Sequence, residues 1–210
     1  CIRDSYTGEQ VSFVLVTVVS FLNLGLAGFV VAAVAARFVF PAMSIEGRVM
    51  WLLRSSPVDV RTVFWAKYWV GTVPLLVIAV PLIVGTNWLL DSTPFVFALT
   101  TVTMIGMTFA LTAMALGLGA LFPNLDTENV AEIPTSFGGL LFMMAAVLYL
   151  GAVVVLEGWP VYRYLAGELQ GGVAIGPGVL VAGFGGALAV TALAIVLPLR
   201  AGLDRMRTLD

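Results

Sequence analysis

The chain has 210 residues, of which 60% are hydrophobic and only 10% are charged, and its mean hydropathy is +1.06. Average soluble domains are about 45–50% apolar and about 25% charged, so this composition excludes an ordinary soluble domain and a disordered chain. The lipid bilayer is the solvent that suits such a sequence. The net charge of −2 gives no reason to expect a nucleic-acid partner.

The residue types that are missing restrict the chemistry. The sequence has no histidine, which excludes Ser-His-Asp triads and histidine-based zinc sites within this chain. Its one lysine, Lys67, precedes Tyr68, so the phosphate-binding loop GxxxxGK[ST] is not present. We therefore expect no catalytic residue, metal site or cofactor in this chain, and we expect ATP and Mg²⁺, if used, on another chain.

Five charge-free apolar stretches are long enough to cross the bilayer as helices, which takes about 20 residues. They cover residues 11–36, 68–90, 94–122, 137–156 and 173–199. Their apolar residues are continuous rather than alternating, which favours helices over a β-barrel. Only residues 91–93 separate the second stretch from the third, which predicts a tight helical hairpin. The sequence thus predicts an all-α membrane protein with one transmembrane domain over residues 1–210.

The basic residues predict an orientation in the membrane. Five of the ten Lys and Arg residues lie in residues 37–67 and three in residues 200–207, so eight fall on one side of a five-span protein. The other side holds only Arg3 and Arg163. Cytoplasmic segments carry the excess of Lys and Arg, so we expect the N-terminus outside and the C-terminus in the cytoplasm.

The interiors of the spans are free of Asp, Glu, Lys and Arg, which disfavours a self-sufficient ion-coupled transporter. Small residues recur at four-residue spacing, as at Ala113 and Gly117, and this spacing favours close helix packing, with a dimer face as the alternative. Pro74 and Pro81 lie seven residues apart in the second span. Each removes a backbone hydrogen bond, so they are candidates for a hinge or for a fixed bend.

The loop over residues 41–66 combines an apolar face with basic residues. Ser44 is a suitable helix N-cap, and Glu46 would lie in the first turn, where the helix dipole favours an acid. The pattern predicts a short amphipathic helix over Ser44–Ser55 that stops before Pro57. Such a helix is either an interfacial anchor or a docking helix that receives force from a soluble partner.

The loop over residues 123–136 holds three acids, Asp126, Glu128 and Glu132, between Pro123 and Pro134. Acid clusters can bind metal ions or act as acid–base pairs. Without a histidine nearby, a solvated turn between helices is the simpler interpretation, and we expect no metal there.

Both loops carry a resemblance to a known family. Arg37-Phe-Val-Phe-Pro-Ala-Met-Ser-Ile-Glu-Gly-Arg, and Leu116-Gly-Leu-Gly-Ala-Leu-Phe-Pro-Asn-Leu-Asp-Thr-Glu-Asn in the second loop, resemble ABC exporter permeases of the ABC-2-type superfamily. The resemblance implies the C-terminal portion of a longer permease in a bacterial or archaeal cytoplasmic membrane. The five spans would be spans two to six of a six-helix half. Ser44–Ser55 would be its cytoplasmic coupling helix, and residues 157–172 an extracellular loop or re-entrant segment.

The same resemblance implies a function. The chain would be the membrane-spanning permease subunit of an ATP-driven exporter and not itself an enzyme. Its partners would be an ABC ATP-binding subunit, the lipid bilayer, and a second permease half or a second copy. The residues expected to contact the ATPase are Ser44, Glu46, Arg48, Trp51, Leu52 and Arg54, with the three acids Asp126, Glu128 and Glu132 as a second contact. The alternative is a non-transporting membrane scaffold or accessory protein.

Overall fold

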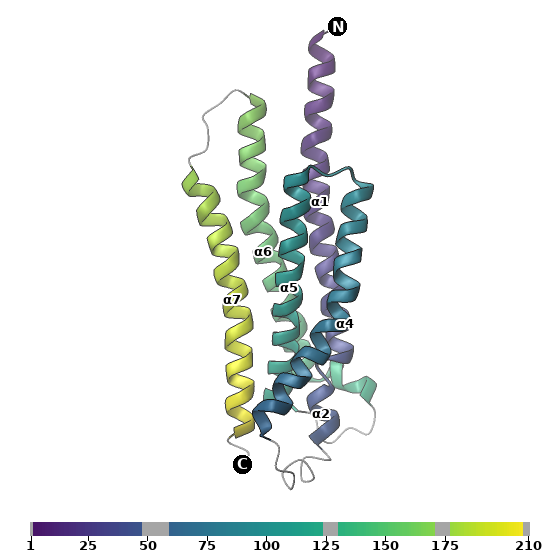
Figure 1. Cartoon of the computed structure of the whole chain (residues 1–210), viewed down its shortest axis with the longest axis vertical. Helices are drawn as coiled ribbons and strands as arrows, with labels where there is room; N and C mark the ends of the chain where they lie inside the picture. The colour runs from purple at the N-terminus through teal and green to yellow at the C-terminus, as the bar shows by residue number, and fades with distance from the viewer. Residues whose placement is uncertain (1, 48–58, 124–129, 171–176, 208–210) are drawn as a thin grey trace.

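The computed structural model describes residues 2–47, 59–123, 130–170 and 177–207 (Figure 1). Within these ranges the chain is all-helical and contains no strand. The elements are α1 (Ile2–Phe38), α2 (Ala42–Gly47), α4 (Val60–Leu89), α5 (Pro94–Leu121), the 3₁₀ helix η1 (Val130–Thr135), α6 (Phe137–Gln170) and α7 (Pro177–Arg207). Five helices, all except α2 and η1, are long and apolar enough to cross a membrane, which confirms the number of spans expected from hydropathy.

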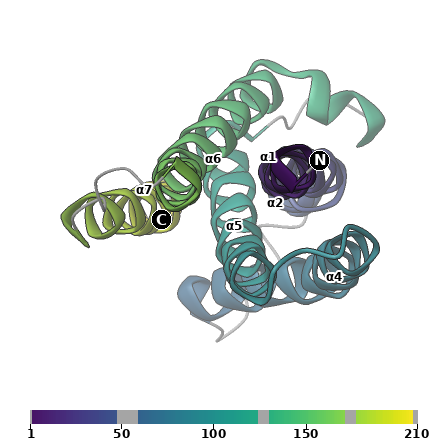
Figure 2. The same cartoon turned by 90° about the horizontal axis from the view of Figure 1, so that it is seen from above.

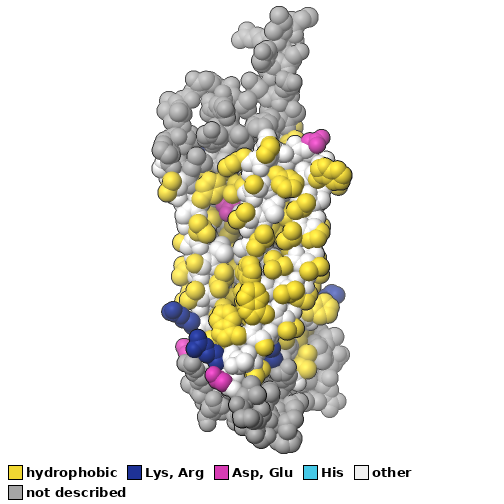
Figure 3. All heavy atoms as spheres, viewed as in Figure 1, with side chains coloured by type: hydrophobic (Ala, Val, Ile, Leu, Met, Phe, Trp, Pro, Cys, Tyr) yellow, Lys and Arg dark blue, Asp and Glu magenta, His cyan; other side chains and the backbone are white. Residues whose placement is uncertain are grey.

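Helix α5 forms the centre of the bundle. Viewed from above, α7 lies on the side of α5 opposite to α1, and α4 and α6 flank it (Figure 2). In the most apolar 18-residue segment of α5, 72% of the residues are buried inside the bundle. In the corresponding segment of α7 only 6% of the residues are buried. The face of the molecule drawn in Figure 3 carries a broad belt of apolar side chains. On the face drawn there, the Lys and Arg side chains gather near the end where α2 lies.

Glycines set the closest helix contacts. A Cβ atom added at Gly117 in α5 would lie 2.3 Å from the carbonyl oxygen of Pro198 in α7. A Cβ atom added at Gly202, one turn further along α7, would lie 3.1 Å from the Cα atom of Gly117. Backbones can approach this closely only where side chains are small. The expectation that the small residues serve helix packing is therefore confirmed at this crossing.

The turn between α4 and α5 is as tight as the sequence predicts. Helix α4 ends at Leu89 and α5 begins at Pro94, with Thr93 as its N-cap. Asp91 has a φ of 47°, in the left-handed region that aspartate tolerates better than most residues. The amide of Ser92 donates to the carbonyl oxygen of Asn87 at 3.2 Å and closes the turn.

Helix α4 begins before the apolar stretch of residues 68–90, and α6 ends after the stretch of residues 137–156. Helix α4 begins at Val60, and its N-cap is Asp59, whose side chain accepts a hydrogen bond from the amide of Arg61 at 3.1 Å. Helix α6 continues to Gln170, through most of the expected extracellular loop or re-entrant segment over residues 157–172. We expected the span to stop before Glu157 because that residue is charged. Its side chain is instead buried against α5, so its charge does not end the helix.

Both Pro74 and Pro81 lie inside α4, and both are exposed on its outer side. The helix changes direction along its length, with the part nearest α2 lying obliquely across the bundle (Figure 1). Proline interrupts the backbone ladder, which accounts for such a bend. The role of the two prolines as a moving hinge stays a prediction.

The crossing of α5 and α7 predicts that Gly117→Ala destabilises the bundle. The added Cβ atom would meet backbone atoms of Pro198, which cannot rotate away, so we expect a loss of on the order of 2 kcal/mol in the free energy of unfolding. Gly151→Ala is the matched control, because no atom lies within 4 Å of its added Cβ. Denaturation of both variants in detergent measures the difference, and equal stabilities would contradict the close crossing.

Candidate functional site

The first candidate site is the end of the bundle at which α2 and the C-terminus lie, called the α2 end here (Figure 1). Helix α2 begins directly after Pro41, whose carbonyl oxygen accepts a hydrogen bond from the amide of Ile45 at 3.0 Å. Ser44 therefore lies within the helix and not at its N-cap, so that expectation is wrong. Its side chain is buried, whereas Ile45 is half-exposed.

The other expected coupling residues are not placed by the structure. Glu46 belongs to α2, but its side chain is not among those described. Arg48, Trp51, Leu52 and Arg54 lie outside the described residues. The coupling helix over Ser44–Ser55 thus stays a prediction beyond Gly47.

Three contacts fix the corner between α1 and α2. The Nζ atom of Lys67 in α4 donates a hydrogen bond to the carbonyl oxygen of Ala42 at 2.8 Å. The ring of Phe40 is fully buried and stacks on Phe142 of α6, with 6.2 Å between ring centroids. A Cβ atom at Gly119 of α5 would lie 2.5 Å from the Phe40 carbonyl oxygen. The corner is therefore held by α4, α5 and α6 together.

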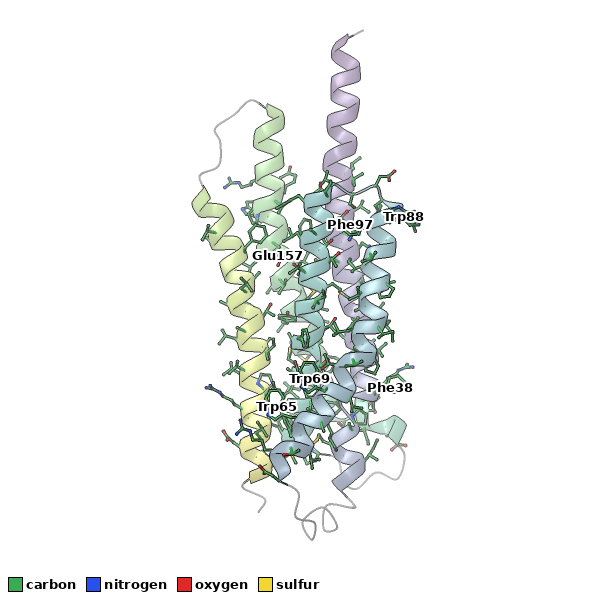
Figure 4. All side chains as sticks on the ribbon, in the orientation of Figure 1. Phe38, Trp65, Trp69, Trp88, Phe97 and Glu157 are labelled. Carbon is green, nitrogen blue, oxygen red and sulfur yellow. The ribbon has the colours of Figure 1, made fainter. Side chains whose placement is uncertain are left out.

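A groove of about 450 Å³ lies between α1 and α4 at the α2 end. Its walls are mostly apolar, including Phe38 and Leu75, and Lys67 supplies its basic group. On the side of α4 that meets Phe109 of α5, Trp65 and Trp69 flank Tyr68 edge-on, with ring centroids 5.6 and 5.9 Å from that of Tyr68 (Figure 4). This end thus combines an apolar groove with aromatic side chains of the kind found at membrane interfaces.

The second expected contact, the acidic loop, is described only in part. Glu132 lies in η1 and is exposed, whereas Asp126 and Glu128 lie outside the described residues. Within the described part of the chain, no group of three or more acidic, histidine or cysteine residues is placed to hold a metal ion. The role of the three acids stays a prediction.

A buried polar network joins three helices at the opposite end of the bundle. The side-chain amide of Asn87 in α4 donates to the hydroxyl of Thr100 in α5 at 2.8 Å. The hydroxyl of Ser92 donates to the Asn87 side-chain oxygen at 3.2 Å and lies 2.9 Å from the hydroxyl of Ser20 in α1. In an apolar environment such bonds fix the positions of the helices relative to one another.

The second candidate site is a buried acid that the sequence analysis did not single out. Glu157 in α6 is only 6% exposed, and its Oε2 atom accepts a hydrogen bond from the hydroxyl of Thr103 in α5 at 2.7 Å (Figure 4). The signal that could have identified it is helical spacing. Tyr149, Val153, Glu157 and Val161 recur every four residues, and all four are buried.

Comparison with known proteins gives one family. The model of a family described as "Putative ATP-binding cassette" matches residues 4–210, nearly the whole chain. Comparison with curated proteins and comparison with solved structures each give no match.

This match corrects three expectations. The family is described as an ATP-binding cassette and not as an ABC-2-type permease, so the identification with that superfamily was wrong. The expected function as the permease subunit of an exporter is wrong with it, and the scaffold alternative gains no support. The expectation that the chain is not an enzyme was also wrong, because ATP-binding cassettes usually hydrolyse ATP.

The bond between Lys67 and Ala42 predicts that Lys67→Met loosens α2. A hydrogen bond from a charged donor contributes about 1.5–3 kcal/mol, so the backbone amide of Ile45 should exchange with deuterium at least about tenfold faster. Lys67→Arg keeps a cationic donor and should exchange more slowly than Lys67→Met. Arg61→Met, at an exposed position of α4, is the control. Unchanged exchange in Lys67→Met would show that the bond does not hold α2.

Proposed function

Because the chain belongs to the family described as "Putative ATP-binding cassette", we propose that it is the membrane-embedded component of an ATP-hydrolysing assembly. One observation carries the proposal. The family match over residues 4–210 includes all five helices that are long and apolar enough to cross a membrane. The matched region is therefore a multi-pass helical bundle.

The phosphate-binding loop needs the sequence GxxxxGK[ST] between a strand and a helix. The chain lacks that sequence, and the described residues contain no strand. We therefore propose that ATP and Mg²⁺ bind to a part of the assembly other than the described bundle, and that the α2 end contacts that part.

The experiment purifies the full chain from its own membranes in mild detergent, together with whatever remains bound. We expect Mg²⁺-dependent ATP hydrolysis in the purified sample, and we expect a photoreactive ATP analogue to label peptides outside the described bundle. Absence of hydrolysis and of labelling would contradict the proposal as a whole. Label on peptides of the described bundle itself would overturn only the assignment of ATP to another part of the assembly.

The basic residues support an orientation with the α2 end and the C-terminus in the cytoplasm. The chain has a single cysteine, so Cys1→Ser gives a background in which one new cysteine reports its side of the membrane. A membrane-impermeant maleimide added to intact cells should label Pro94→Cys at the start of α5 and not Asp204→Cys near the end of α7. Both positions are exposed. The reverse labelling pattern would invert the orientation.

A further inference from the structure

Glu157 lies where α5, α6 and α7 meet. Thr103 of α5 bonds its Oε2 atom at 2.7 Å. On the side of α7, a Cβ atom added at Gly183 would lie 2.7 Å from the carbonyl oxygen of Leu156, the residue before Glu157. Two turns away along α6, the hydroxyl of Tyr149 lies 3.1 Å from that of Thr191 in α7. The carboxyl group is thus enclosed by three helices, in the apolar part of the chain.

No described cationic side chain forms an ion pair with Glu157. Helix α5 has no ionisable residue, and α7 has none in the described part before Arg200. Among the α1 side chains that the structure describes, the cation is Arg37, in the last turn at the α2 end, and the side chain of Arg3 near the start of α1 is not among those described. On α6 itself the nearby ionisable groups with described side chains are Tyr149, Tyr162 and Arg163, and the Arg163 guanidinium lies over the Trp159 ring, 5.4 Å from its centroid.

An ionised carboxylate in this position would be costly. Moving an unpaired charge out of water into an apolar region costs several kcal/mol at least, and buried groups usually avoid the cost by becoming neutral. A calcium or magnesium ion could neutralise the charge, but each of these ions prefers six or more oxygen ligands. The described side chain that bonds Glu157 supplies one hydroxyl oxygen, that of Thr103. A single proton satisfies the same site without further ligands.

We propose that Glu157 is a proton-binding site inside the bundle. The hydrogen bond from Thr103 reaches Oε2, which leaves Oε1 to carry the proton. Release of the proton would place an unpaired negative charge between α5 and α6, beside the contact of α6 with Gly183 of α7. The ionised form therefore favours arrangements in which water reaches Glu157, so proton release and helix rearrangement are linked. This inference does not depend on where ATP binds.

The first test uses dicyclohexylcarbodiimide, an apolar reagent that reacts with protonated carboxyl groups. The carboxyl oxygen adds to the central carbon of the reagent and the proton moves to its nitrogen, so the whole reagent is added with no leaving group. With the full chain in lipid nanodiscs at neutral pH, we expect Glu157 to be labelled faster than exposed Asp204 by on the order of 100-fold or more. Peptide mapping by mass spectrometry measures both sites, and Glu157→Gln identifies the labelled peptide.

The second test is infrared difference spectroscopy of the same nanodiscs, which does not require access by a reagent. At neutral pH we expect a protonated-carboxyl C=O band that is absent in Glu157→Gln. Thr103→Val should shift this band, because the carboxyl loses its hydrogen-bond donor. Thr101→Val is the matched control, because the Thr101 hydroxyl bonds only within its own helix, to the carbonyl oxygen of Phe97 at 2.7 Å.

Two results would overturn the proposal. An ionised-carboxylate band for Glu157 at neutral pH, in place of the protonated one, would show that the site holds no proton. Loss of carbodiimide labelling on addition of sodium chloride, but not of choline chloride, would show that the site binds a metal ion. Neither result would bear on the ATP-dependent activity proposed above, because that activity is measured by hydrolysis and nucleotide labelling.

Discussion

Polar groups inside the apolar part of this bundle must find their partners within the protein, because hydrocarbon offers none. Polar side chains of the described bundle satisfy this requirement in two ways, with an exception at Asn23 of α1, whose buried Nδ2 atom has no hydrogen-bond partner. The hydroxyls of Thr72, Thr108 and Thr112 bond to carbonyl oxygens of their own helices, one turn earlier. Asn87 and Glu157 instead bond across helix boundaries. The hydrogen bonds of Asn87 and Glu157 hold neighbouring helices together, so those helices cannot separate without leaving a polar group without its partner.

Much of the fold could be predicted because membrane helices follow simple rules of length and hydropathy. The five spans and the hairpin at residues 91–93 depend on those rules alone. The predictions were wrong where a rule based on neighbouring residues in the sequence was overridden by tertiary contacts. Ser44 has the chemistry of an N-cap, but the chain turns into α2 earlier, at Pro41. Glu157 was used to mark the end of a span, although Thr103 gives its carboxyl a partner inside the bundle.

The candidate sites were less predictable than the fold. The loop residues that carried the resemblance to ABC-2-type permeases indicated an ATP-dependent system, but they did not identify the family that matches the chain. A short motif reports local backbone chemistry, and unrelated activities can share it. The buried acid required knowledge of a contact between residues 103 and 157, which lie 54 positions apart. Helical spacing could place Glu157 on the buried face of α6, but neither spacing nor composition specifies its partner over that distance.

The crossing of α5 and α7 also constrains how this sequence can diverge. Gly117 and Gly202 face each other across backbones that almost touch, so neither position can enlarge alone. The outward-facing positions of α7, such as Val181, Leu188 and Leu197, meet no such limit, because any apolar side chain of similar size can occupy them. Among sequences that share this bundle, the outer face of α7 should therefore vary freely, while residues 117 and 202 remain small as a pair. In a related sequence with larger residues at both positions, we expect α7 to lie further from α5.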